Sequence, residues 1–228
     1  SSAPSDGAWF PSPHSGDSTW ATWGSISTWF VDESGVSSLD IQCTADPSMG
    51  LSESDDRSLN AIIPSGDAQE VTCEAIDSAM QTSGSRTWHL GVPFTVSTDS
   101  QKLSDPHPVT LTPAGGWPEL QVEVSLVQSG SSQSSGITAL SEETTILAPS
   151  SDMIPGGVWV EVSVQGDGTY HMEGLYDLGI TKESSPPLIS ISDSMWDGSQ
   201  WSMQGQYSDP DGESVSFTMR VDGSAAGS

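Results

Sequence analysis

The chain has 228 residues, with 31 acidic residues against 5 Lys and Arg and a formal net charge of −26. Because so few cations are present to neutralise phosphate, this balance argues against binding nucleic acid or an anionic membrane surface. No apolar run approaches the roughly 18 residues of a membrane-spanning helix, so we expect no membrane insertion. Nine tryptophans and evenly spread apolar segments indicate a folded chain.

Short apolar runs are separated by Ser, Thr, Gly, Asp and Pro, which is typical of an all-β, turn-rich protein. Residues 1–18 are rich in Pro and Gly and are predicted to form an irregular N-terminal segment. Residues 19–98 form the first predicted module. Its strands are expected in the β-rich segment Trp20–Val31, at Leu59–Ile63, around the two cysteines, and finally as one strand over Arg86–Val96.

Cys43 and Cys73 are the only cysteines in the chain, and each lies in a segment of period-two alternation. This pattern places both on the inward face of a predicted strand. A disulfide that joins the two layers of a β-sandwich is one interpretation, and two buried free thiols are the alternative. A disulfide would indicate an oxidising compartment, and therefore an extracellular protein.

Residues 99–185 form the second predicted module, with strands recurring at the spacing of a β-sandwich. Glu119–Val127 is the clearest strand, since its apolar and polar residues alternate without a break. Val158–Val164 is the next strong strand, and a Gly-Asp-Gly turn leads from it into a hairpin with Tyr170–Leu175. Ser129–Gly136 is of low complexity and is predicted to be a mobile loop.

Residues 186–228 are predicted to be a partial third module that follows a Pro-rich linker. Leu188–Ile191 is its expected first strand. A hairpin is expected next, in which Gln200–Tyr207 pairs with Ser214–Val221 around the turn Asp209–Gly212. So short a segment is near the lower limit for a domain that folds alone. The third module is therefore either truncated or completed by another chain.

The run Tyr207-Ser208-Asp209-Pro210-Asp211-Gly212-Glu213 and the alternating segment after it resemble a known class of modules. They are similar to the tandem immunoglobulin-like, PKD-like and cadherin-like modules of archaeal and bacterial surface and secreted proteins. The cysteine segments resemble the paired cysteine strands of the same class. The resemblance implies two to three tandem immunoglobulin-like β-sandwiches. It also implies work as a stalk, adhesin, surface-layer or appendage subunit, or as an accessory module of a larger protein.

Asp209, Asp211 and Glu213 place three carboxylates in one tight turn and are the candidate metal ligands. Calcium takes six to eight oxygen ligands, and Asp-rich loops supply them. Calcium is therefore the one cofactor that we consider. The alternative is a plain Asp-Pro-Asp-Gly turn, in which the Asp side chains bond to the backbone.

Tryptophans crowd the start of the chain and flank a turn in the third module. Exposed in a row they would stack on sugar rings, whereas buried they would be core or would seal contacts between subunits. Trp23 and Trp29 are able to share one strand face, and Trp196 and Trp201 flank the turn. These four are the candidate interface or glycan-binding residues.

We expect an extracellular, non-catalytic protein of structural or adhesive function, which associates with itself or with neighbouring surface proteins. The chain has neither the GxSxG nor the SxxK motif of a serine nucleophile. A sandwich that lacks strands exposes edges that pair with other chains. The alternatives are carbohydrate-binding modules and an accessory region of a larger secreted hydrolase.

Overall fold

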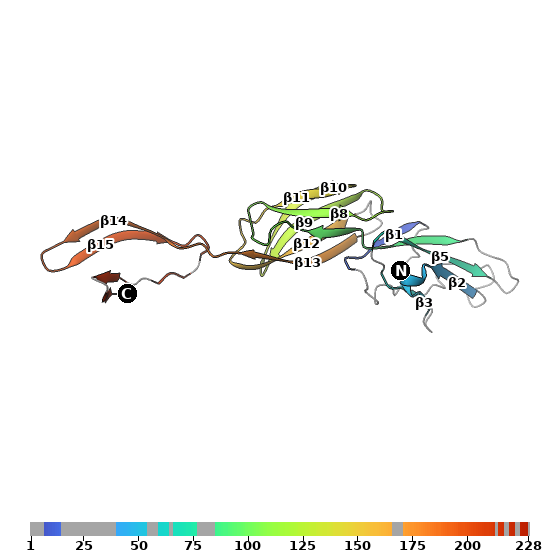
Figure 1. Cartoon of the computed structure of the whole chain (residues 1–228), viewed down its shortest axis with the longest axis horizontal. Helices are drawn as coiled ribbons and strands as arrows, with labels where there is room; N and C mark the ends of the chain where they lie inside the picture. Colours follow the sequence, from blue (N-terminus) through green and yellow to red (C-terminus); the bar gives the residue numbers. More distant parts are fainter. Residues whose placement is uncertain are drawn as a thin grey trace.

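The computed structural model describes residues 7–14, 40–53, 59–63, 66–76, 85–165, 171–212, 214–216, 219–221 and 224–227. The β-rich segment expected at Trp20–Val31 lies outside these ranges. The regular structure of the described part is β-strand apart from one turn of 3₁₀ helix, so the all-β prediction is confirmed. The two modules and a C-terminal hairpin follow one another along the long axis of the molecule (Figure 1).

The described part of the first module is built on one four-stranded sheet with the order β1-β6-β5-β2. Strand β1 runs parallel to β6, and the other neighbours are antiparallel. Alternate side chains of β5 and β6, including Val71, Cys73, Trp88 and Leu90, pack into one core. The elements of this module are β1 (Ala8–Pro11), β2 (Asp40–Ala45), η3 (Pro47–Met49), β3 (Ser52–Glu53), β4 (Leu59–Asn60), β5 (Gln69–Ile76) and β6 (Arg86–Gly91).

The two cysteines form a disulfide, but its expected position between two layers is wrong. Cys43 and Cys73 lie directly opposite each other on β2 and β5, which are hydrogen-bonded neighbours in one sheet, with a Cα–Cα distance of 4.1 Å. The bond therefore ties neighbouring strands together. It closes a chain separation of 30 residues. In the chain-entropy account, closing a loop of that length stabilises the module by about 3–4 kcal/mol.

The second module is a two-layer sandwich. Its larger sheet has the order β10-β9-β12-β13 and its smaller sheet the order β11-β8-β7. The chain crosses between the sheets three times, and seven strands joined in this Greek-key manner match the immunoglobulin-like architecture. The strands are β7 (Phe94–Ser97), β8 (His107–Pro113), β9 (Leu120–Gln128), β10 (Ser131–Leu140), β11 (Thr144–Ala148), β12 (Gly156–Gln165) and β13 (His171–Lys182).

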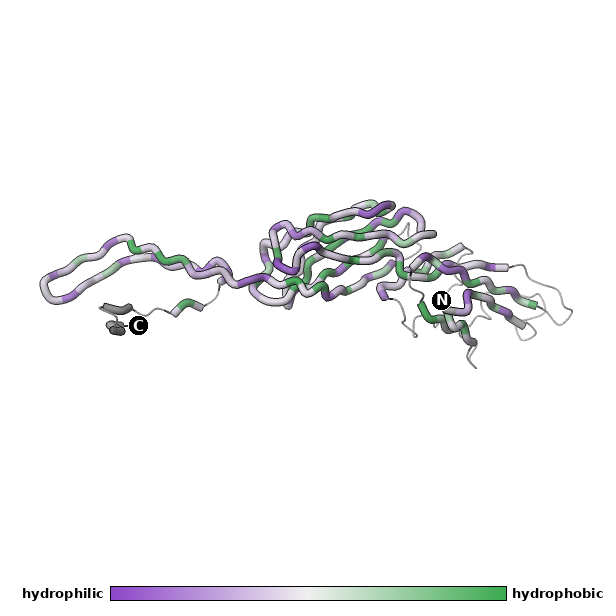
Figure 2. Tube along the Cα trace, viewed as in Figure 1, coloured by the Kyte–Doolittle hydropathy of each residue, from purple (hydrophilic) through white to green (hydrophobic). Residues whose placement is uncertain are grey.

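The alternation read from the sequence sets the core of this sandwich. Every second residue of β9, from Leu120 to Leu126, is buried. Every second residue of the neighbouring strand β12, from Val158 to Val164, is buried on the same face of the sheet. Figure 2 shows the same alternation of apolar and polar residues along the central strands. The predicted hairpin between β12 and β13 is confirmed by their antiparallel pairing.

Two predictions about strands are wrong in this region. Ser129–Gly136 is not a loop: a turn at Ser129-Gly130 leads into β10, which pairs with β9 at the edge of the sheet. An edge strand tolerates polar residues because much of it faces solvent. The single strand expected over Arg86–Val96 is two strands in different sheets. The second, β7, pairs with β8, and its Phe94 packs in the core of the second module.

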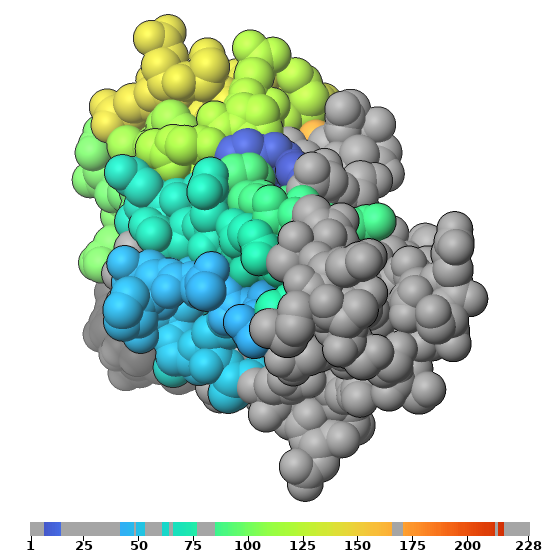
Figure 3. All heavy atoms as spheres, turned by 90° about the vertical axis from the view of Figure 1, so that its right-hand side faces the viewer, coloured from blue at the N-terminus to red at the C-terminus, as the bar shows by residue number. Residues whose placement is uncertain are grey.

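The two modules are joined by backbone and ring contacts. The backbone N–H of Ala68 donates to Gly115 O at 3.0 Å, and Gly115 N–H donates to the Asp67 carboxylate at 2.8 Å. The rings of Trp9 in β1 and Trp117 lie 5.1 Å apart. In the end-on view, the blue and turquoise residues of the first module are in front, and the green and yellow residues of the second appear above them (Figure 3). The joint therefore combines hydrogen bonds with aromatic packing.

The C-terminal strands do not pair as the sequence suggested. Residues Trp201–Ser208 (β15) pair with Leu188–Trp196 (β14), and not with Ser214–Val221. Within the latter range, Met219–Val221 (β16) pairs instead with Ser224–Gly227 (β17). Both possible hairpins have alternating strands on either side of an Asp-Gly turn, so local pattern alone did not distinguish them.

His107 is a buried polar residue near the C-terminal end of the second module. Ser104 N–H donates to Nδ1 at 3.3 Å, which leaves the proton on Nε2 to be donated to Thr98 Oγ1 at 3.0 Å. Thr98 Oγ1 in turn donates to Pro108 O at 3.0 Å. Burial lowers the pKa of His107 below its ordinary value. The imidazole is therefore held neutral and supports the local chain.

This arrangement predicts a loss of stability in mild acid. The unfolded chain takes up a proton on His107 below about pH 6.5, whereas the folded chain resists it, so the free energy of unfolding falls as the pH falls. Chemical denaturation between about pH 7.5 and 5.5 should show a decrease of up to about 1.4 kcal/mol per pH unit. His107→Gln should flatten that slope. Equal slopes in the two proteins would contradict the assignment.

Candidate interaction surface

The C-terminal hairpin projects from the second module as an isolated two-stranded sheet. Strand β14 has 9 residues and β15 has 8, and they pair along their whole length. Neither strand has a second neighbour among the described residues. Every side chain from Leu188 to Ser208 is exposed. With respect to the described part of the chain, the sheet therefore has two solvated faces and two open edges, in contrast to the packed sheets before it (Figure 1).

The two faces of the hairpin differ in character. Residues opposite each other in an antiparallel pair point to the same face. From this register, one face carries most of the large apolar side chains, and the other carries Ser, Gln and Asp together with Leu188 and Met195. In Figure 2 the clearly green, apolar residues of the hairpin lie along β14. The face defined here as the apolar face carries the large side chains of Ile189, Ile191, Trp196, Trp201, Met203 and Tyr207.

A β-bulge at Ser192 brings these side chains onto one face. Ile191 and Trp196 are an odd number of residues apart, so an unbroken strand would place them on opposite faces. The register shifts between Ile191 and Asp193, and the extra residue, Ser192, restores the alignment. The Ser192 hydroxyl donates to Gln204 O across the pair at 3.1 Å. The sequence analysis missed this face because the bulge breaks the period-two pattern.

Gly205 makes room for the bulge. A Cβ added to this residue would lie 2.4 Å from the carbonyl oxygen of Ser190 and 3.3 Å from the Cα of Ile191. Both atoms belong to the backbone, so neither is able to move aside as a side chain would. Glycine is therefore required at this point of β15 for the two backbones to approach.

The tip of the hairpin is closed by the side chain of Asp197. Its carboxylate accepts hydrogen bonds from Gln200 N–H at 2.8 Å, from Ser199 N–H at 2.8 Å and from the Ser199 hydroxyl at 2.9 Å. These bonds, with the Gln200 N–H foremost, lower the pKa of Asp197. Gly198 adopts a φ of 100°, which favours glycine. The turn is thus ordered by its own residues.

A second carboxylate anchors the base of the hairpin. Asp211 accepts a hydrogen bond from Ser185 N–H in the linker, and its carboxylate lies 3.6 Å from Lys182 Nζ at the end of β13. The Ser185 bond, followed by the Lys182 charge, lowers the pKa of Asp211 although partial desolvation acts against it. Lys182 Nζ also donates to Met153 O in the second module. The turn after β15 is therefore tied to the sandwich.

These contacts bear on the predicted calcium site. Asp209 Oδ1 accepts from Asp211 N–H at 2.8 Å, and the Asp211 carboxylate binds the linker and Lys182. This is the side-chain-to-backbone bonding of the alternative interpretation, a plain turn. Glu213 lies outside the described residues. Among the residues that are described, no three acidic, His or Cys side chains group as metal ligands, and calcium here stays a prediction.

The candidate tryptophans divide into two pairs. Trp196 and Trp201 are 52% and 62% exposed and lie opposite each other beside the tip turn. Their ring centroids are 5.9 Å apart and their planes are tilted by 43°. Trp23 and Trp29 lie outside the described residues. The structure therefore brings one aromatic pair together at an exposed position.

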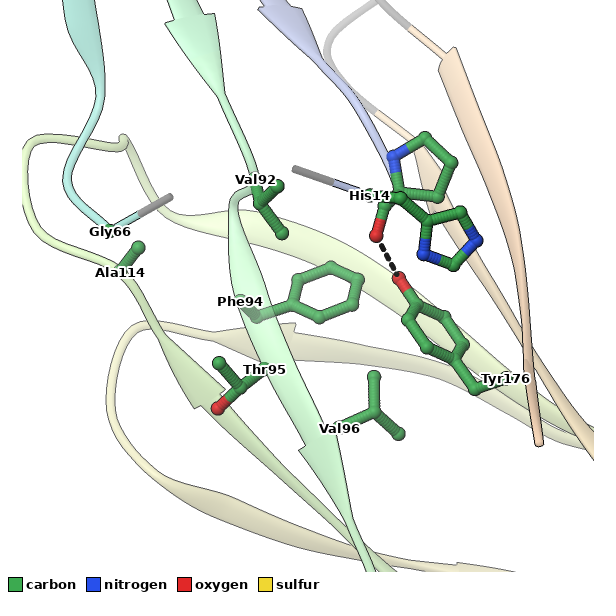
Figure 4. Close-up of a pocket in the computed structure, with 9 residues that line it drawn as sticks. His14, Gly66, Val92, Phe94, Thr95, Val96, Ala114 and Tyr176 are labelled. Atoms are coloured by element: carbon green, nitrogen blue, oxygen red, sulfur yellow. Dashed lines mark hydrogen bonds between the residues drawn. The ribbon is translucent and has the colours of Figure 1, made fainter. Parts of the chain in front are cut away.

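A groove of about 410 Å³ lies where the two modules meet (Figure 4). Val92, Phe94 and Val96 line it on one side and Tyr176 on the other. The Tyr176 hydroxyl donates to Pro13 O at 3.2 Å, and burial raises the pKa of Tyr176 to about 12, so the phenol stays protonated. The Tyr176 hydroxyl thus serves the joint between the modules. Sequence analysis did not identify Tyr176, since its role depends on the placement of residues far apart in the chain.

Comparisons with known proteins find little that resembles this chain. No protein-family model matches the chain, and no curated protein matches it. Among solved structures, the human desmocollin-1 ectodomain matches with a TM-score of 0.26 and 11% identity, over 80% of this chain and 35% of that one. The chain thus spans about a third of that structure. No helix in the described ranges has the length and apolar character needed to cross a membrane.

The bulge makes a specific prediction for Gly205→Ala. The added methyl group would meet the Ser190 carbonyl, so the register beyond the bulge should be lost and Trp196 and Trp201 should separate. We expect the exciton coupling between these rings in circular dichroism to fall by at least about half, since such coupling requires close aromatic rings. The matched control is Gln204→Ala, on the opposite face, which should keep the signal. An unchanged signal in Gly205→Ala would show that the bulge is not required.

Proposed function

We propose that this chain is an extracellular, non-catalytic protein of structural or adhesive function, a stalk, surface-layer or filament subunit. Its C-terminal hairpin is the element that contacts a neighbouring surface protein. The second module holds this element at one end of the molecule (Figure 1).

The exposed apolar face of the hairpin is the observation that carries this proposal. A two-stranded hairpin is marginally stable alone in water, and contiguous exposed apolar patches mark interaction sites. Fully burying one large apolar side chain is worth about 1.5–3 kcal/mol. Covering six half-exposed side chains would therefore yield on the order of 5 kcal/mol. A partner supplies this stabilisation when it covers the face.

Two further observations support the extracellular and non-catalytic parts of the proposal. The Cys43–Cys73 disulfide persists in an oxidising compartment. The groove between the modules is lined mainly by apolar side chains, and its Tyr176 hydroxyl is engaged with Pro13. Buried His107 has both ring nitrogens bonded within its own segment. These groups maintain the structure.

Carbohydrate binding is the second candidate function, and the Trp196–Trp201 pair favours it. Exposed indole rings side by side are able to stack on sugar rings. The 43° tilt between the planes means that the two rings offer an angled surface. This candidate needs the tryptophans alone, whereas the contact proposal needs the whole apolar face, including Ile191 and Met203.

The proposal predicts that the apolar face retains the protein at the cell surface. Ile191→Ser combined with Met203→Ser leaves both tryptophans in place but removes apolar area from the middle of the face. In the source cells this variant should be released into the medium at least about tenfold more than the wild type, since it loses two of the six large apolar side chains whose burial drives association. Cell-surface and medium fractions are measured by immunoblotting.

The matched control is Gln204→Ser combined with Gln206→Ser, on the opposite face of the same hairpin. It should be retained as the wild type is. Retention of both variants to the same extent would contradict a contact function for the apolar face. Release of the first variant only would support it.

A further inference from the structure

Resting on the proposed function, we infer that the partner of the apolar face is the same face of a second copy of this chain. The two hairpins pack face to face about a two-fold axis and point in opposite directions, so that the tip of each lies over the base of the other. Each copy thus completes the two-layer packing that the other lacks.

The distribution of charge determines where two copies of this chain are able to approach each other. The chain carries a net charge of −26, so most surfaces of two copies repel each other. Residues 188–208 contain only two ionisable acids, Asp193 and Asp197, and no basic residue. Asp193 is paired with Gln204 on the opposite face, and Asp197 closes the tip. The apolar face therefore has no charge, and a second copy is able to approach there.

The order of large and small residues on the face is self-complementary. Four cross-strand pairs form it, and the middle two each combine a large residue with a small one. The large residue is on β14 in one of these pairs and on β15 in the other. From base to tip the pairs are Ile189 with Tyr207, Ile191 with Gly205, Ser194 with Met203, and Trp196 with Trp201.

In the middle of the face, a two-fold axis across the strands brings large residues over small ones. Under this operation the second pair of one copy faces the third pair of the other. Ile191 then lies over Ser194 of the second copy, and Met203 lies over Gly205 of the second copy. Because the axis is two-fold, each contact occurs twice. Interdigitation of this kind is what packing between two sheet faces requires.

Charge also selects this arrangement over one with both bases at the same end. An axis along the strands would likewise place Ile191 over Gly205, but it would bring two acidic sandwiches together. The eight residues of β15 span about 26 Å in extended form. That length exceeds the Debye length of about 8 Å at physiological salt. With the hairpins in opposite directions, the sandwiches lie at opposite ends and their repulsion is screened.

The contact is small, because the face is only two strands wide. It belongs to the lower end of the size range of specific interfaces, and so the dimer should dissociate on dilution. Sedimentation velocity of the full chain over a range of concentrations is therefore the primary measurement. The wild type should shift from monomer to dimer as the concentration rises.

Two variants with the same chemistry distinguish the faces. Ser194→Glu places a carboxylate in the middle of the apolar face, and Ser190→Glu places one on the opposite face of the same strand. We expect Ser194→Glu to raise the dimer dissociation constant by at least about 30-fold, because the carboxylate would be buried without a partner. Ser190→Glu should change it by less than about threefold, since its carboxylate stays in water. Equal effects would overturn the proposal.

Cross-linking reports the orientation. A mixture of the Ile191→Cys and Ser194→Cys variants should form an intermolecular disulfide under mild oxidation. A mixture of the Ser194→Cys and Met203→Cys variants, which would face each other with both bases at one end, should form little. The reverse result would overturn the opposite-direction dimer.

The remaining outcomes separate this inference from the proposed function. A chain that stays monomeric at all concentrations overturns the second copy as partner, while surface retention that depends on Ile191 and Met203 would still support a contact function. A monomer that binds an oligosaccharide, with binding lost in Trp201→Ala, overturns the dimer in favour of a glycan.

Discussion

The candidate interaction surface of this chain depends on one close approach of two backbones. At Gly205, β15 passes so near β14 that a Cβ would lie 2.4 Å from the Ser190 carbonyl oxygen. That approach accommodates the bulge at Ser192, and the bulge places Trp196 on the same face as Ile191. Without it, the apolar residues near the tip would be on one face and those near the base on the other. A single glycine thus makes the hairpin amphipathic.

The rest of the molecule provides a support for that hairpin. The second module has a continuous core between two sheets, whereas the hairpin has none. Asp211 ties the turn after β15 to Ser185 and Lys182, and Lys182 is in turn bonded to Met153 O. The base of the hairpin is therefore held while its faces stay open. An acidic surface elsewhere leaves the uncharged apolar face as the place where association meets least repulsion.

Sequence reasoning predicted what depends on local alternation. The all-β class and the core positions of β9 and β12 followed from a period of two, which burial against the opposite sheet enforces. The pairing of Cys43 with Cys73 also followed, but not the fact that β2 and β5 are neighbours in one sheet. Which strands are neighbours depends on contacts across the fold, and the alternation within one strand does not identify its neighbour.

The candidate site was predicted only in part, for the same reason. Trp196 and Trp201 stood out by residue type, but the face that they share with Ile191 was hidden by an odd spacing. Asp209 and Asp211 stood out as carboxylates, although their roles in the turn and in the linker anchor depend on Ser185 and Lys182. The bulge depends on the strand that pairs with β14, and the anchor depends on residues far from Asp211 in the chain. Neither is predictable from one segment alone.

Hydrogen–deuterium exchange of the full chain, compared between dilute and concentrated solution, tests most directly whether the hairpin is open alone and covered by a second copy. The amides of β14 and β15 should exchange rapidly when dilute and at least about tenfold more slowly when concentrated, whereas those of β9, in the sandwich core, should be slow in both. Hairpin amides that exchange at the same rate at every concentration would contradict this account.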